Sequence, residues 1–139
     1  MKSFRICQKL NYAIESDEKK ANVDKLTHFI REKMLQAGHV EVLEDAQSID
    51  YIFSIGGDGT MLHSMHHNIG KGSLVVGVNA GNVGFLTPYS IQDMLSSDVT
   101  SLLENPRIEK RSILEHNFNG EKGVAVNDYA ITAPAPNGM

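Results

Sequence analysis

Ser54-Ile55-Gly56-Gly57-Asp58-Gly59-Thr60 is the stretch of sequence that decides the fold. It ends the apolar run 51–55, which is typical of a buried strand, and a helical pattern begins at Met61. A strand that turns directly into a helix in this way indicates an α/β fold. Because glycine has no Cβ, the turn can adopt positive φ and a ligand can lie directly on its backbone.

The same stretch suits a phosphate group. The first turn of a helix has unpaired N–H groups that point toward the preceding loop. We therefore expect a phosphate loop made of Gly56, Gly57, Gly59 and Thr60. A lone carboxylate, Asp58, is an odd choice beside an anion unless it acts on a hydroxyl group or a metal. We interpret the stretch as a phosphoryl-transfer site, with a purely structural turn as the alternative.

Strand and helix patterns alternate on both sides of this turn. We expect strands at 4–8, 39–43, 51–55 and 73–79, and helices at about 17–37, 60–68 and 91–103. Gly38 is a helix stop, and Ser90 with Asp93 resembles a capping box. Residues 1–106 are therefore predicted to form a Rossmann-like parallel sheet flanked by helices, which is a nucleotide-binding domain.

The pattern changes after residue 106. Residues 108–118 and 124–132 have strand character, and Asn119-Gly120 is a strong hairpin turn between them. Residues 107–139 are therefore predicted to form a β-hairpin that begins a second, β-rich region.

Composition excludes several classes of function. The net charge of −4 and the lack of a basic run argue against a nucleic-acid partner. No segment has the length and apolar character of a membrane span, and no signal peptide is recognised, so we expect a cytoplasmic protein. Two of three nearby histidines, His63 and His67, are spaced to share a metal, but the sequence supplies no third ligand and leaves any metal site unknown.

A second glycine-rich loop follows the apolar strand at 73–79 and reads Ala80-Gly81-Asn82-Val83-Gly84-Phe85-Leu86. Since such loops lie at the carboxyl ends of parallel strands, we expect the two loops to converge. Together with Arg111, Leu114 and Val126-Asn127-Asp128, they resemble the NAD kinase family over nearly the whole chain. Lipid kinases of the diacylglycerol type and phosphofructokinases share the first motif but have a different second one.

The resemblance implies phosphoryl transfer from ATP, with Mg²⁺, to the 2′-hydroxyl of the adenosine ribose of NAD, giving NADP. Asp58 would accept the proton of that hydroxyl. The NAD-binding residues that the resemblance implies are Asp58, Gly59, Leu62, Phe85, Asn127 and Asp128. Leu62 and Phe85 would line the adenine side. The family has an Asn-Glu pair where this chain has Asn127-Asp128, so the acid is one methylene shorter here. The family is oligomeric, and we expect a homo-oligomer.

Family members continue into a β-rich domain with a further Gly-Asp-Gly segment and a Ser/Thr/Pro-rich loop, which this sequence lacks. We therefore expect the chain to be a fragment or a shortened relative, with weak or no turnover by itself. Two functions stay open, namely NAD kinase and a non-catalytic NAD- or nucleotide-binding module derived from it.

Overall fold

The computed structural model describes residues 1–8, 16–44, 48–81, 84–128 and 130. The chain divides into two compact units, Met1–Arg107 and Ile108–Met139. Each unit is described by itself below. In the part of the chain that the structure describes, no helix is both long enough and apolar enough to cross a bilayer.

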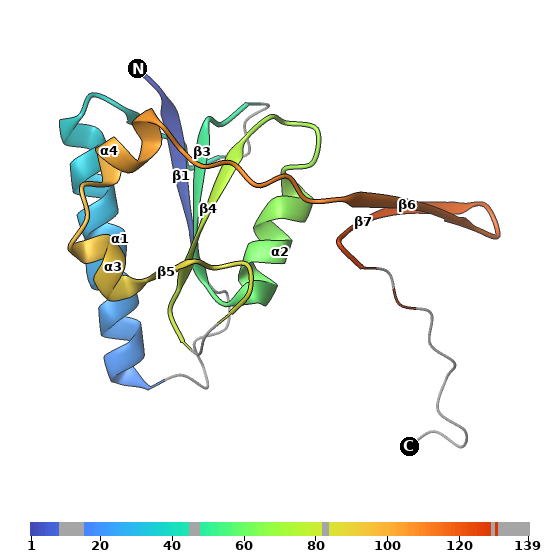
Figure 1. The fold of residues 1–139 in the computed structure, drawn as a ribbon, viewed down its shortest axis with the longest axis horizontal. Helices are drawn as coiled ribbons and strands as arrows, with labels where there is room; N and C mark the ends of the chain where they lie inside the picture. The colour runs from blue at the N-terminus through green and yellow to red at the C-terminus, as the bar shows by residue number, and fades with distance from the viewer. Residues whose placement is uncertain (9–15, 45–47, 82–83, 129, 131–139) are drawn as a thin grey trace. The chain divides into compact units, whose positions relative to one another are not determined.

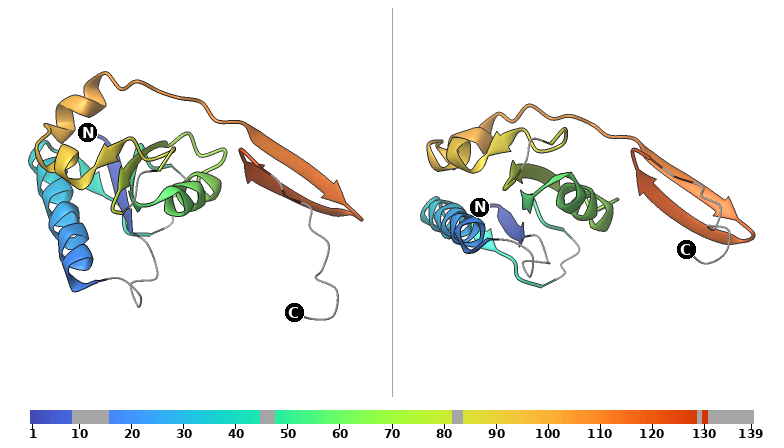
Figure 2. Two further views of the ribbon diagram at one scale, coloured as in Figure 1. Left: turned by 60° about the horizontal axis from the view of Figure 1, so that its bottom comes forward. Right: turned by 90° about the horizontal axis from the view of Figure 1, so that it is seen from below.

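The first unit is built on a parallel sheet with the strand order β2-β1-β3-β4-β5. The strands are β1 (Ser3–Gln8), β2 (Val40–Glu41), β3 (Tyr51–Gly56), β4 (Leu74–Asn79) and β5 (Tyr89–Ser90). The helices are α1 (Asp17–Gln36), α2 (Asp58–His67), α3 (Ile91–Leu95) and α4 (Val99–Glu104). Helices α1, α3 and α4 cover one face of the sheet and α2 covers the other (Figures 1 and 2). The predicted parallel α/β fold is confirmed.

The strand order creates a switch point between β1 and β3. The chain leaves β1 for α1 on one face of the sheet, and it leaves β3 for α2 on the opposite face (Figure 2). In open parallel sheets, ligands bind outside the carboxyl ends of the strands at such a point. The stretch that begins at Gly56 therefore lies at the edge where this architecture binds ligands.

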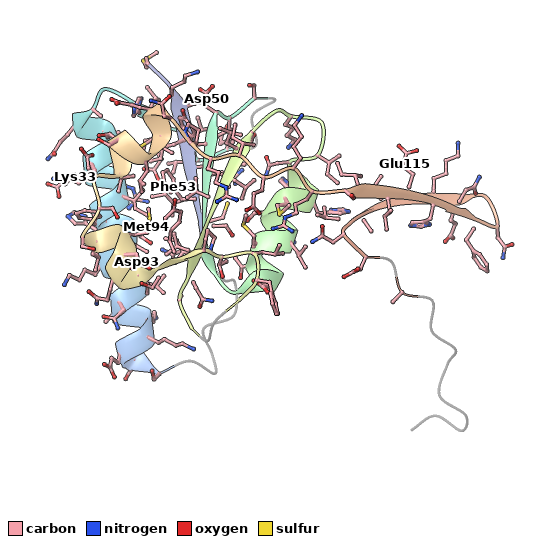
Figure 3. The ribbon with its side chains drawn as sticks, in the orientation of Figure 1. Lys33, Asp50, Phe53, Asp93, Met94 and Glu115 are labelled. Carbon is pink, nitrogen blue, oxygen red and sulfur yellow. The ribbon has the colours of Figure 1, made fainter. Side chains whose placement is uncertain are left out.

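The main core lies between the sheet and the helices α1, α3 and α4. Phe53 of β3 and Met94 of α3 are fully buried there (Figure 3). The helix α1 presents apolar residues at helical spacing to this layer, namely Val23, Leu26, Ile30 and Met34. On the opposite face, the Ser64 hydroxyl of α2 donates to the buried Ser54 hydroxyl of β3, at 3.1 Å. The sheet that carries the first glycine loop is thus held on both faces.

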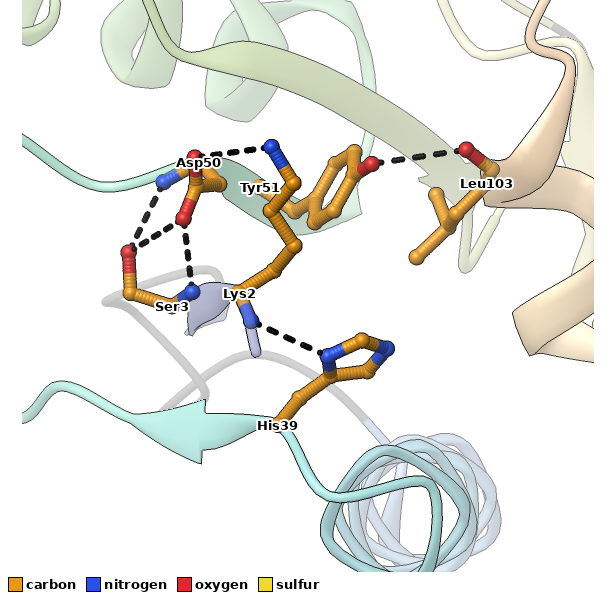
Figure 4. Close-up of polar contacts among 6 residues, drawn as sticks. All are labelled: Lys2, Ser3, His39, Asp50, Tyr51 and Leu103. Carbon is orange, nitrogen blue, oxygen red and sulfur yellow. Dashed lines mark hydrogen bonds and ion pairs between the residues drawn. The ribbon is translucent and has the colours of Figure 1, made fainter.

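The amino-terminal edge of the sheet is fastened by a separate polar cluster (Figure 4). Asp50 Oδ2 accepts hydrogen bonds from the Ser3 backbone N–H at 2.7 Å and from the Ser3 hydroxyl at 3.0 Å. Lys2 Nζ lies 3.7 Å from Asp50 Oδ1. The Tyr51 hydroxyl donates to the Leu103 carbonyl at 3.3 Å, which ties α4 to β3. These contacts join β1, β3 and α4 at the edge opposite the glycine loops.

The helix predicted at 91–103 is wrong as a single element, because the structure has two helices there, α3 and α4. The capping box of Ser90 and Asp93 is confirmed at the start of α3. After Leu95, the Ser96 hydroxyl donates back to the Gln92 carbonyl, and the Asp98 side chain caps a new helix by accepting from Thr100 and Ser101. A strong N-cap inside an apolar pattern therefore restarts the helix.

The second unit is an antiparallel hairpin of β6 (Ile113–Phe118) and β7 (Glu121–Val126). The predicted turn is confirmed, since Asn119 and Gly120 have φ values of 51° and 83°. The predicted strand bounds are wrong in two ways: residues 108–112 and 127–128 lie outside the strands, and β7 begins at Glu121 rather than at residue 124. Residues 129, 131 and 132 of the predicted strand are outside the described residues.

Candidate functional site

The first glycine loop joins β3 to α2 without any residue at positive φ, so its glycines do not use the positive φ that they permit. Gly56 is required for close packing instead, because a Cβ on it would collide with the Thr60 side chain. Gly57 is the N-cap of α2, and a Cβ on Gly57 or Gly59 would meet no atom within 4 Å. The glycines that follow β3 therefore leave bare backbone beside the first turn of α2, as an anion requires.

Asp58 begins α2, and its carboxylate is held by the second glycine loop. Asp58 Oδ2 accepts a hydrogen bond from the Phe85 backbone N–H at 2.9 Å, and Oδ1 accepts one from the Leu86 N–H at 2.9 Å. A carboxylate in the first turn is also stabilised by the helix dipole. The expected convergence of the two glycine loops is thus present in the structure, with Asp58 as the side chain that joins them.

Two side chains hold the second loop in shape. Asn79 ends β4, and its amide donates to the Thr87 hydroxyl at 3.1 Å while its carbonyl accepts from the Gly81 N–H at 2.8 Å. The backbone also links the loops, since the Ala80 N–H donates to the Gly56 carbonyl at 2.9 Å. The loop that donates hydrogen bonds to Asp58 is therefore attached to the ends of both β3 and β4.

Gly84 is the point of closest approach between the two loops. A Cβ on Gly84 would collide with Asp58 Oδ1 and would lie 2.8 Å from the Thr87 hydroxyl. Gly77 is equally constrained, because a Cβ there would lie 2.9 Å from the Leu86 carbonyl and 3.0 Å from Met61 Sδ. Only glycine at these positions allows the backbone N–H groups of the second loop to reach the carboxylate.

The two apolar residues predicted to line the adenine side lie on different elements of this edge. Leu62 is a partly buried residue of α2, one turn beyond Asp58. Phe85 lies in the second loop with 97% of its surface exposed, although its backbone N–H binds Asp58. A large aromatic side chain in this setting is available for stacking on a ligand.

Asn127 and Asp128 follow β7 in the second unit. Asn127 has a φ of 68°, and its N–H donates to the Ser112 carbonyl at 3.0 Å. A non-glycine residue in the left-handed region is uncommon and often marks a functional site. Asp128 is exposed directly after it.

No group of three or more His, Cys, Asp or Glu side chains in the described residues can hold a metal ion. The His63 and His67 rings stack on α2 with their centroids 6.3 Å apart, but they are only two potential ligands.

Sequence reasoning identified Asp58 but missed the residues that hold it. Asn79 and Thr87 were not singled out, although an asparagine at the end of a buried strand is a recognisable signal for a braced loop. The backbone N–H groups of Phe85 and Leu86 carry no side-chain signal at all.

Comparison with known proteins gives a consistent result. A family model described as the ATP-NAD kinase N-terminal domain matches residues 7–105. The chain is 34% identical to a NAD kinase of Chlorobium phaeobacteroides (strain DSM 266) over 102 residues, covering 70% of this chain and 35% of the relative. It is 36% identical to a NAD kinase of Heliobacterium modesticaldum over 97 residues, covering 66% of this chain and 34% of the relative. A NAD kinase of Chlorobium phaeobacteroides (strain BS1) is 30% identical over 118 residues, and the match covers 81% of this chain and 41% of the relative. The chain thus spans between a third and about two-fifths of the length of these relatives.

Proposed function

Because the chain belongs to the ATP-NAD kinase family, we propose that it supplies the nucleotide-binding portion for phosphoryl transfer from ATP to NAD. The products are ADP and NADP, and the acceptor is the 2′-hydroxyl of the adenosine ribose. The observation that carries the proposal is the Asp58 carboxylate, which is fixed at the switch-point edge by two backbone N–H groups. Mg²⁺ enters as part of the MgATP substrate.

Asp58 acts as the general base in this reaction. Each of its oxygens accepts one backbone hydrogen bond at 2.9 Å, and a carboxylate oxygen has a second lone pair that can accept another. One of these lone pairs accepts the proton of the ribose hydroxyl while that oxygen attacks the γ-phosphorus of ATP. The new O–P bond forms as the bond to the β-phosphate oxygen breaks, and ADP leaves. A positioned base contributes about 10²–10⁴-fold to such a rate.

The first unit supplies further members of the proposed binding set at the same edge. Gly56, Gly57, Gly59 and Thr60 form the phosphate loop, since Gly57 and Gly59 leave open backbone beside the first turn of α2. Leu62 and Phe85 contact the adenine, and the exposed Phe85 ring is suited to stacking. Asn127 and Asp128 of the second unit hydrogen-bond NAD, as the family motif implies.

The proposal is tested by NADP formation from NAD and MgATP, followed with an NADP-specific coupled dehydrogenase. Wild-type chain and Asp58→Asn are compared, and calorimetry measures NAD binding to both. Turnover that falls at least 10²-fold in Asp58→Asn while NAD still binds supports the base. Equal turnover by both proteins contradicts it.

A second candidate function is a nucleotide-binding module without turnover. The observation that favours it is the open backbone at Gly57 and Gly59 beside α2, which can hold a nucleotide phosphate without any transfer of it. NAD binding without measurable NADP formation by the wild-type chain would support this alternative. Turnover that depends on Asp58 would exclude it.

The hairpin β6–β7 supports two further expectations. It is a two-stranded sheet with exposed apolar side chains, including Ile113 at 48% and Phe118 at 67%. Since isolated hairpins are marginally stable, we propose that residues 107–139 begin a larger β-rich domain and that copies of the protein self-associate. Light scattering that gives a monomer at high concentration would contradict self-association. A cytoplasmic location stays a prediction of the sequence.

A further inference from the structure

Lys19 lies in the first turn of α1, and its ammonium group reaches the second glycine loop. A Cβ built on Gly81 would lie 3.3 Å from Lys19 Nζ and 3.5 Å from Lys19 Cε. Lys19 is partly buried, whereas Glu18 and Lys20 on either side of it are exposed. The side chain therefore lies along the protein surface toward the loop rather than extending into solvent.

This contact places a positive charge and a carboxylate on the same loop. The loop after β4 meets Lys19 at Gly81, and it holds Asp58 through the N–H groups of Phe85 and Leu86. The helix α1 follows β1 and α2 follows β3, so Lys19 and Asp58 come from the two elements that diverge at the switch point. The two charged groups therefore contact the two ends of the same loop.

We propose that Lys19 binds a phosphate group of the nucleotide held at this edge. The inference rests on the proposed function and adds a residue to it. A lysine ammonium is a compact charge with three N–H donors, which suits a phosphate oxygen, and phosphoryl transfer depends mainly on positioning and charge neutralisation. Glycine at position 81 leaves room for the ammonium against the backbone, because a side chain there would be in close contact with Nζ.

The phosphate has two sources, the triphosphate of ATP and the pyrophosphate of NAD, and calorimetry of the full chain separates them. MgATP and NAD are titrated separately into wild type, Lys19→Met and Lys20→Met. The control removes the same charge from the adjacent, exposed position. Lys19→Met is expected to lower the affinity for one of the two ligands about tenfold, as for a lost hydrogen bond between charged groups. Lys20→Met is expected to change the affinity for either ligand by less than about twofold.

Lys19→Arg retains the charge and is expected to recover most of the lost affinity, while Lys19→Gln is a second neutral variant that should repeat the loss. The weakened ligand identifies the phosphate source. If Lys19→Met and Lys20→Met have equal affinities for each nucleotide, Lys19 does not bind the phosphate. Nucleotide binding by wild type would still support the proposed function. If wild type binds neither nucleotide, both proposals fail. Circular dichroism verifies that each variant is folded.

Discussion

Gly84→Ala is expected to detach Asp58 from the second glycine loop. A Cβ at this position would collide with Asp58 Oδ1 and lie 3.0 Å from Asp58 Cγ, so the carboxylate and the loop have to separate. The separation breaks the two hydrogen bonds, each 2.9 Å long, from the Phe85 and Leu86 N–H groups. The substitution therefore disrupts a specific contact rather than a general surface property.

The expected loss follows from the number and exposure of these bonds. A hydrogen bond to a charged group contributes about 1.5–3 kcal/mol, and overpacking costs about 1–3 kcal/mol. Asp58 is only partly buried and the loop is flanked by the exposed Phe85, so water compensates for part of the loss. We expect the free energy of unfolding to fall by about 2 kcal/mol. This corresponds to a melting temperature lower by roughly 10 °C in a domain of this size.

Urea unfolding monitored by far-ultraviolet circular dichroism measures this change. The helical signal reports the first unit, because every helix in the described part of the chain lies within it. Gly57→Ala is the matched control, since it makes the same substitution in the neighbouring loop at a position where a Cβ meets no atom within 4 Å. We expect the control to unfold within about 0.5 kcal/mol of wild type.

A double-mutant cycle with Asp58→Ala identifies the cause. If Gly84→Ala acts through the carboxylate, it costs less once Asp58 has been removed, and the coupling energy is expected to be about 1–2 kcal/mol. Equal stability of Gly84→Ala and Gly57→Ala would refute the loop contact. Additive effects of Gly84→Ala and Asp58→Ala would show that the loss arises elsewhere.

Three further outcomes are expected. The Ser3 backbone N–H, the Ser3 hydroxyl and the charge of Lys2 lower the pKa of Asp50 below its usual value of 3.8. Because this pKa is lower in the folded state, Asp50 stabilises the fold above pH 3.8, and the stabilisation is lost as the pH falls through the folded-state pKa. The urea concentration at the midpoint of unfolding should therefore decline less for Asp50→Asn than for wild type between about pH 5 and 3. Tyr51→Phe removes the 3.3 Å hydrogen bond to the Leu103 carbonyl and should cost about 0.5–1.5 kcal/mol in the same urea assay, whereas no change would show that this bond does not hold α4. Gly57→Ala should weaken nucleotide binding in calorimetry while its stability is unchanged, and unaltered affinity would mean that phosphate does not lie on that backbone.

Much of the fold was predictable because apolar periodicity and glycine position are local signals. The strands at 51–55 and 73–79, the helix after Asp58 and the Asn119-Gly120 turn all follow from them. The break between α3 and α4 was not predicted. There the apolar spacing through Leu103 favours one helix, and the Asp98 side chain overrides it by capping a second one.

The site was predictable at its centre and not at its supports. Asp58 is marked by its position after a strand that ends on glycines, whereas its partners are two backbone N–H groups that any residue type could supply. The close-packing role of these glycines was not predictable for a related reason. Close approach of other atoms, which explains Gly56 and Gly84, depends on tertiary structure, whereas positive φ is a local property.

The contact between Asp58 and the second loop also indicates which step of the proposed reaction this chain can support. Two hydrogen bonds hold the carboxylate in the structure without a ligand, so the proposed base would lose little conformational freedom on meeting the ribose hydroxyl. The Phe85 ring, in contrast, has 97% of its surface exposed and gains its packing only when a ligand covers it. We therefore expect the proposed turnover to be limited mainly by nucleotide affinity, so that NADP formation rises as the NAD concentration approaches saturation.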